Sequence, residues 1–389
     1  MINNKHLHIV SFDIPFPADY GGVMDVFYKV KALHQAGIKV ILHCFQYRDR
    51  QPQAELAQYC EKVYYYKRDI SPLSMAYSFA TGMPFITASR MKNALLKNLK
   101  LDNHPILFEG MHTCGYLSDK GLKNRLKIVR MHNIEWAYYR NLEELEYSYL
   151  KKIYFKTESL KLKQFENQIL KYADYILTIS PDDDEYYKKL YEAQNLNENS
   201  IVYIPPFHPN SGVEIKTGTG NYVLFHGKLS VSDNEKVAFY LINNVFSKIE
   251  IPFVIAGKEP SDRLKREIAR HENIRLEANP NEGKMNELIQ NAQVNLLLSF
   301  QKSGMKLKLL NALYRGRFCI VNRDMIQNTG LETLCQIKNT SREIRAAVES
   351  YMNVQFSAKS VTERGHILKN GFSNEDNAGK IVALLREKG

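Results

Sequence analysis

The sequence predicts an α/β protein of two domains, each built around an open parallel sheet. Short buried-type strands alternate with helices from residue 7 onward, which is typical of such sheets. The alternation stops at residues 204–212, where two adjacent prolines and a polar, glycine-containing tail suggest a linker, and it begins again at residue 222. The length of 389 residues agrees with this division, because it fits about two to three domains.

In the first half, a Pro/Gly loop follows the first strand and leads into a helix near Val23, with Phe27, Val30 and Leu33 on one face. One long helix is expected over residues 142–172, from the helical spacing of its apolar positions. The expected strands are residues 7–12, 40–45, 105–109, 126–130 and 175–180.

In the second half, the expected strands are residues 222–226, 253–257, 274–276, 294–298 and 318–322. Helices are expected over residues 237–246, 285–292 and 307–314, with another ending near 271. We therefore place the first domain at residues 1–204 and the second at 205–370. A final helix within residues 371–389 is expected to cross back to the first domain.

Composition limits the function classes. Hydrophobic residues at 44% and charged residues at 24% exclude a mostly disordered chain. The net charge of +11 suggests an anionic partner, namely a phosphorylated ligand, nucleic acid or an anionic membrane, with ordinary surface lysine as the alternative.

The chain has five cysteines without Cys-x-x-Cys spacing, so neither a disulfide framework nor a structural zinc site is expected, and reduced thiols fit the cytoplasm. No stretch approaches the ~20 apolar residues of a membrane span. The first apolar run is too short for a signal peptide. We expect a cytoplasmic protein, with peripheral contact at the inner face of the cytoplasmic membrane as a further hypothesis.

Polar residues after the strands of the first half form candidate sites, since ligands of parallel sheets bind beyond the carboxyl ends of strands. Gly21 and Gly22 sit between a strand and a helix, where backbone N–H groups can meet an anion; a tight turn is the alternative. The cluster after the strand at residues 126–130 could bind sugar hydroxyls or simply cap a helix. The candidates there and after the preceding strand are His132, Asn133, Glu135 and His112.

In the second half, Gly227 and Lys228 follow the first strand, where they could approach and neutralise a phosphate or form an ordinary surface turn. The start of the helix near residue 304 is the stronger phosphate candidate. There Gly304 and free N–H groups could hold a diphosphate, with Lys306 or Lys308 adding charge; a plain basic helix start is the alternative.

Two basic, aromatic regions remain, at residues 64–100 and 142–172. Each mixes lysines or arginines with Tyr, Phe and other apolar residues. Either could touch a membrane surface as a basic amphipathic element. Solvated lysines on ordinary helices packed by aromatic residues are the alternative.

These features resemble GT-B glycosyltransferases, with two Rossmann-like domains facing across a cleft, and are most similar to a divergent bacterial branch of the retaining family-4 group. The resemblance spans nearly the whole chain. It rests on the segments at residues 17–22, 129–140, 173–180, 224–234, 254–258 and 303–322. It implies transfer of a sugar from a nucleotide-sugar, held by the second domain, to an acceptor held by the first, without a metal or other cofactor.

The resemblance also implies residue roles. Gly21 and Gly22 match the glycine loop near the donor phosphates, and His132 looks like the histidine of the site. Gly227 and Lys228 match a Gly-Arg pair that contacts the diphosphate.

The pattern departs from the family at two glutamates spaced eight positions apart, which fall here on Ser303 and Asn311. Asn311 could still bind a ribose hydroxyl, whereas Ser303 is a poor replacement for a carboxylate facing the sugar. The second basic residue of the phosphate clamp aligns near Asp233, so Lys306 or Lys308 would take its place.

We therefore expect a retaining enzyme that moves a hexose-type sugar from a UDP- or GDP-linked donor to a glycan or lipid-linked saccharide in cell-surface polysaccharide synthesis. His132 would orient donor or acceptor, and Glu135 would support it or act on the acceptor hydroxyl. A GT-B nucleotide-sugar epimerase and a non-catalytic nucleotide-sugar-binding subunit are the alternatives. No nucleic-acid-binding motif is present, so nucleic acid is not an expected partner.

Overall fold

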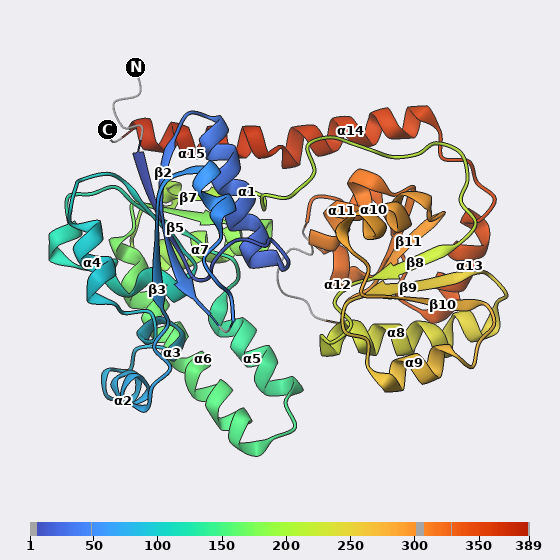
Figure 1. Cartoon of the computed structure of the whole chain (residues 1–389), viewed down its shortest axis with the longest axis horizontal. Helices are drawn as coiled ribbons and strands as arrows, with labels where there is room; N and C mark the ends of the chain where they lie inside the picture. Colours follow the sequence, from blue (N-terminus) through green and yellow to red (C-terminus); the bar gives the residue numbers. More distant parts are fainter. Residues whose placement is uncertain (1–5, 48, 301–306, 328, 388–389) are drawn as a thin grey trace. The chain divides into compact units, whose positions relative to one another are not determined.

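The computed structural model describes residues 6–47, 49–300, 307–327 and 329–387, which form two compact units (Figure 1). Unit 1 contains the described residues up to His208 together with those from Phe372 onward, and unit 2 is Pro209–Gly371. Each unit is an α/β domain with its own parallel sheet and its own buried core.

Unit 1 is built on a seven-stranded parallel sheet in the order β3-β2-β1-β4-β5-β6-β7. The first strand lies between β2 and β4, so the strand order reverses beside it, and in such sheets ligands bind at the carboxyl edge near this point. The strands are β1 (His6–Ser11), β2 (Lys39–Gln46), β3 (Cys60–Lys67), β4 (Ile106–Glu109), β5 (Lys127–Arg130), β6 (Tyr175–Thr178) and β7 (Ile201–Tyr203).

Helices cover both faces of this sheet, as the two apolar core clusters of unit 1 show. Helix α1 begins at the Gly21-Gly22 pair, slightly before the expected start at Val23. The helices of unit 1 are α1 (Gly21–Gln35), α2 (Pro72–Thr81), α3 (Phe85–Ala88), α4 (Asn93–Leu99), α5 (Glu135–Leu145), α6 (Tyr149–Ile169), α7 (Pro181–Ala193) and α15 (Asn374–Glu387).

The expected single helix over residues 142–172 is wrong. The segment is part of a helical hairpin, in which α5 ends before Glu146 and α6 begins at Tyr149 (Figure 1). The break has a local cause, because Glu146 is extended and its Oε1 accepts hydrogen bonds from the backbone N–H groups of Tyr147 and Ser148, at 2.9 and 3.0 Å.

The region at residues 64–100 forms ordinary strand and helix structure. Its tyrosine run lies in the edge strand β3, which the sequence analysis missed, and the apolar stretch that follows forms α2 and α3. Strand β3 pairs with β2 alone.

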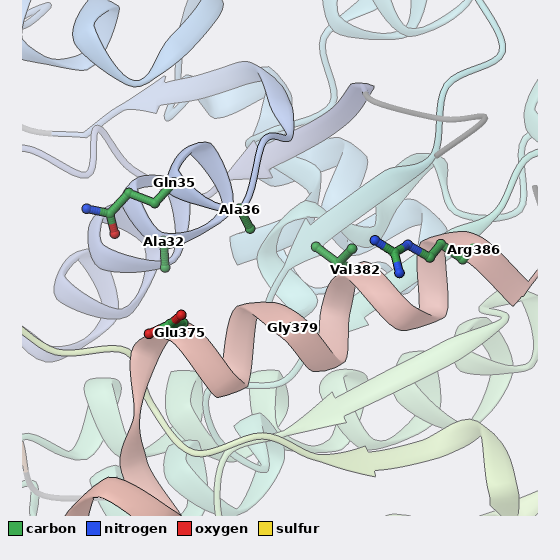
Figure 2. A pocket seen from close by; sticks show the side chains of 7 residues that line it. All are labelled: Ala32, Gln35, Ala36, Glu375, Gly379, Val382 and Arg386. Atoms are coloured by element: carbon green, nitrogen blue, oxygen red, sulfur yellow. The ribbon is translucent and has the colours of Figure 1, made fainter. Parts of the chain in front are cut away.

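The last helix, α15, packs on α1 within unit 1, and its apolar face enters the same core as β1 and β2. The buried residues of that face are Ala378, Ile381, Val382, Leu384 and Leu385. A shallow groove of about 630 Å³ runs between the two helices (Figure 2). Its α1 residues, Gln35 and Ala36 among them, lie at the end of α1 remote from Gly21, so this groove is separate from the carboxyl edge of the sheet.

Unit 2 repeats the architecture with a six-stranded parallel sheet in the order β10-β9-β8-β11-β12-β13. Its strands are β8 (Val223–His226), β9 (Phe253–Gly257), β10 (Ile274–Ala278), β11 (Val294–Leu297), β12 (Phe318–Val321) and β13 (Gln336–Ile337). Its helices are α8 (Ser232–Asn244), α9 (Asp262–Ile268), α10 (Glu282–Asn291), α11 (Leu307–Arg315), α12 (Arg323–Ile326), α13 (Ser341–Tyr351) and α14 (Ala358–Phe372, whose last residue is assigned to unit 1).

Within the described ranges, no helix combines the length and the apolar character that a membrane span requires.

Candidate active site

At the carboxyl edge of the unit 1 sheet, five ionisable side chains form one buried network. Two come from helix α1, two end the neighbouring strands β4 and β5, and one follows β5. They are Asp25, Lys29, Glu109, Arg130 and His132. All are fully buried except His132, which is 9% exposed. Buried charges must be paired, and here two acids face two bases.

Lys29 is the centre of this network. Its Nζ donates to Asp25 Oδ2 at 2.9 Å, one turn back on α1, and to Glu109 Oε1 and Oε2 at 2.7 and 2.9 Å. Burial alone would favour the neutral carboxyl, but Lys29 and the hydrogen bond from His132 outweigh it and lower the pKa of Glu109. Glu109 is therefore a carboxylate at neutral pH.

Arg130 ties the same network to the end of unit 1. Its guanidinium donates to both oxygens of Asp25, at 3.0 and 3.2 Å, and to the backbone carbonyls of Thr178, Ile204 and Pro205. Burial opposes ionisation of Asp25, but Arg130 and Lys29 hold the pKa of this carboxyl well below its usual range. The segment expected to be a linker is thus hydrogen-bonded to the sheet edge through the backbone carbonyl of Pro205.

His132 is the member of the network that reaches the surface. Its Nε2 lies 2.8 Å from Glu109 Oε2, and the Phe12 ring packs edge-on against it at 5.2 Å. Because an ionised carboxylate only accepts hydrogen bonds, Nε2 carries the proton. The other ring nitrogen, Nδ1, is not used by this bond, which suits a histidine that orients a hydroxyl.

Asp25, Glu109 and His132 present metal-type ligand atoms within 4.8 Å of one another. The donor set does not fit a divalent cation, because the Lys29 ammonium already binds Asp25 Oδ2 and both oxygens of Glu109. We assign no metal role to these residues.

Glu135 and His112 lie together beside this network. Glu135 opens α5 and is 3% exposed, and its Oε1 lies 3.9 Å from His112 Nδ1. Burial raises the pKa of Glu135 to about 7, against the opposing hydrogen bond to Asn133. Burial, reinforced by Arg90, lowers the pKa of His112 well below its usual value. The carboxyl can therefore exchange a proton near neutral pH, whereas the imidazole stays neutral.

The Gly21-Gly22 pair lies in the first turn of α1. A Cβ at Gly22 would lie 2.7 Å from the Phe12 ring, so a side chain there would press on the residue that packs against His132. Tyr20, which precedes the pair, donates to Asp13 Oδ2 at 2.7 Å and has no side-chain cap bond to the helix. The N–H groups of this turn therefore have no capping side chain.

In unit 2, two glycines let the strand ends of β8 and β9 approach closely. A Cβ at Gly257 would lie 1.9 Å from the carbonyl oxygen of Gly227, and one at Gly227 would lie 3.0 Å from Asn234 Nδ2. Lys308 reaches the same place from α11, donating to Asn234 Oδ1 at 2.9 Å. Gly227 and Lys308 thus both contact Asn234 at the carboxyl edge of the sheet.

Lys228 and Asp233, which flank this edge, both interact with other residues of unit 2. Lys228 is half exposed and pairs with Glu259 at 3.3 Å, in the loop after β9. Asp233 accepts from Ser299 Oγ and from the Phe300 backbone N–H, each at 3.0 Å. Asp233, which stands where the resemblance expects a second basic residue, therefore binds the segment that follows β11.

His226 is a buried residue of the same edge that the sequence analysis did not select. It ends β8 directly before Gly227, and within the described residues its buried Nε2 has no hydrogen-bond partner. Burial, with Lys308 nearby, lowers the pKa of His226 to about 3, so the ring is neutral at physiological pH.

Three predicted residues, Ser303, Gly304 and Lys306, lie outside the described residues. Asn311 lies one turn after Lys308 on α11, and its Oδ1 accepts from Arg315 Nε at 3.2 Å.

The structure brings together His132, Glu135 and His112 in unit 1, and Gly227 and Lys308 in unit 2. The sequence analysis missed the partners that position them, which are Asp25, Lys29, Glu109, Arg130 and Asn234, and it also missed the neighbouring His226. One signal was available, since Glu109 and Arg130 end adjacent predicted strands and are register partners.

Comparisons with known proteins place part of this chain in a family. Residues 220–352 match the family model described as "Glycosyl transferases group 1". A protein of Klebsiella pneumoniae described as "Uncharacterized 44.6 kDa protein in cps region" is 25% identical over 391 residues, which cover 94% of this chain and 97% of that protein.

Two solved structures show the fold. TarM of S. aureus superposes with a TM-score of 0.66 at 10% identity over 98% of both chains. HepE of Anabaena, in complex with UDP and glucose, superposes with a TM-score of 0.60 at 10% identity over 99% of this chain and 100% of that one. The chain therefore carries a glycosyl transferases group 1 domain at residues 220–352 and has the GT-B fold, with two Rossmann-like domains.

Proposed function

We propose that this protein is a retaining glycosyltransferase that moves a hexose-type sugar from a UDP- or GDP-linked donor to a glycan or lipid-linked saccharide. The observation that carries the proposal is the carboxyl edge of unit 2, where Gly227, Asn234 and Lys308 converge inside the matched family domain. The cps-region relative supports a place in cell-surface polysaccharide synthesis.

In unit 2, the leaving diphosphate would bind at this edge. Gly227 puts no side chain at this edge, where Asn234 packs against the backbone, and the Lys308 ammonium would offset the negative charge that grows as the sugar–phosphate bond breaks. A lysine in this position supplies the charge that other transferases obtain from a metal ion. Neutral His226 beside Lys308 adds no competing positive charge.

In unit 1, the acceptor would bind at the edge occupied by His132 and Glu135. Glu109 fixes the ring of His132 so that Nδ1 can accept a hydrogen bond from a sugar hydroxyl. Glu135 has a pKa near neutrality and could take the proton of the acceptor hydroxyl. Asn133 and His112 complete the acceptor side.

A thermal-shift screen with UDP, GDP and their sugars tests the donor half of this proposal, followed by donor turnover on the best hit. We expect a nucleotide diphosphate to raise the melting temperature of the wild type and of Lys359→Gln, an exposed lysine elsewhere in unit 2, but not of Lys308→Gln. Absence of any shift would contradict the proposal. Nucleotide release without acceptor would favour an epimerase, and binding without turnover would favour a non-catalytic subunit.

A further inference from the structure

Helix α2 of unit 1 buries polar side chains and exposes apolar ones. It carries no charged residue, and it buries two serines, Ser74 and Ser78, while its apolar side chains face solvent. Leu73 is 82% exposed and Phe79 is 80% exposed. A helix at a water-facing surface normally buries its apolar stripe, so this face lacks the covering it requires.

The hairpin of α5 and α6 exposes a second apolar group at its tip. Tyr147 is 91% exposed, Tyr149 76% and Leu150 78%. The tip also carries three lysines, Lys151, Lys152 and Lys156, of which Lys151 lies 3.9 Å from Glu146 at the turn of the hairpin.

Helix α2 and the hairpin are in contact within unit 1. Lys161 of α6 donates to Ser78 Oγ of α2 at 3.2 Å and lies 6.0 Å from the centre of the Phe79 ring. Glu158 of α6 accepts from the backbone N–H of Phe85, which follows α2, at 2.6 Å. Both α2 and the hairpin project from the same end of unit 1 (Figure 1).

We propose that this surface, formed by α2 and residues 147–157, docks on an anionic lipid bilayer. Exposed leucine and phenylalanine side chains can enter the interface, tyrosines suit the depth of the headgroups, and lysines meet anionic lipid. A second copy of the chain is a poorer occupant, because the lysines of the tip would face one another in a molecule of net charge +11. Nucleic acid would use the lysines but leave the apolar side chains of α2 in water.

This surface is independent of sugar transfer, so its test needs no donor or acceptor. Purified full-length protein is mixed with vesicles of phosphatidylglycerol and phosphatidylcholine, or of phosphatidylcholine alone, and binding is measured by flotation. We expect binding to the anionic vesicles that falls more than about tenfold in Leu73→Ser/Phe79→Ser and in Lys151→Gln/Lys152→Gln/Lys156→Gln.

The matched control is Lys248→Gln/Lys265→Gln/Lys284→Gln, which removes the same charge from exposed positions of unit 2 and should bind as the wild type does. Circular dichroism checks that each variant is folded. The proposal is overturned if the protein ignores anionic vesicles, if the unit 2 control weakens binding as much as the tip variant does, or if Leu73→Ser/Phe79→Ser abolishes a dimer detected by sedimentation instead of vesicle binding.

Discussion

Lys29 allows two carboxylates to be buried together at the carboxyl edge of the unit 1 sheet. Its ammonium contacts both Asp25 and Glu109, and Glu109 in turn fixes His132. The orientation of His132 therefore depends on a lysine that is fully buried.

Lys29→Met should lower the free energy of unfolding by about 3–5 kcal/mol, because it leaves buried carboxylates short of a partner. Lys189→Met is a matched control: it breaks an exposed i,i+4 pair with Glu185 on α7 and should leave the free energy of unfolding nearly unchanged. Urea unfolding of the intact chain measures both. Equal costs for the two variants would show that the network is not a buried, interdependent unit.

Glu135 makes the stability of the folded protein depend on pH. Its pKa is about 7 in the folded protein and near 4.5 when unfolded, so the unfolded chain loses the proton first as pH rises. Folding then takes up a proton between these values, and stability falls from about pH 4.5 to pH 7.

Glu135→Gln removes this contribution. Its stability relative to the wild type should therefore rise by up to about 3 kcal/mol over that pH range. Glu185→Gln serves as the control and should show no such rise, because the pKa of Glu185 is lowered by its hydrogen bond with Lys189. Unfolding curves at several pH values provide the measurement, and a flat difference for Glu135→Gln would contradict the assignment.

At the scale of elements, buried apolar runs predicted most strands of both sheets, because a parallel strand covered on two faces is apolar throughout. Strand β3 was not predicted because it is an edge strand with several half-buried or exposed residues and so lacks a continuous apolar run. The break before α6 was not predicted because the turn contains no glycine or proline and is stabilised instead by the side chain of Glu146. The ionic network was missed because Asp25 and Lys29 look like an ordinary surface pair one helical turn apart.

The contact between β8 and β9 depends on Gly257. Gly257→Ala should destabilise unit 2 by about 1–3 kcal/mol or more, since the new Cβ would clash with the Gly227 carbonyl, and it should also weaken nucleotide binding. Gly371→Ala is the matched control, because a Cβ there meets nothing within 4 Å near the end of α14, and it should be neutral or stabilising by up to about 1 kcal/mol. Thermal unfolding compares them; equal stability of the two variants would argue against close packing at this edge.

For the molecule as a whole, the net charge of +11 divides into groups with different roles. Lys29 and Arg130 balance buried acids, Lys308 serves the proposed diphosphate site, and the lysines of the hairpin tip serve the proposed membrane surface. Composition could indicate an anionic partner but could not distinguish these uses, because they depend on which lysines the fold buries.

The central claim is that one chain combines a diphosphate site in unit 2 with an acceptor site in unit 1 to transfer a sugar. Its most direct test is nucleotide diphosphate release from UDP- and GDP-sugars, measured with and without glycan or lipid-linked acceptors. We expect acceptor-dependent release that falls at least about a hundredfold in both Lys308→Gln and His132→Ala, and that persists in Lys359→Gln. Release from none of the donors, or release unchanged in both site variants, would contradict the account.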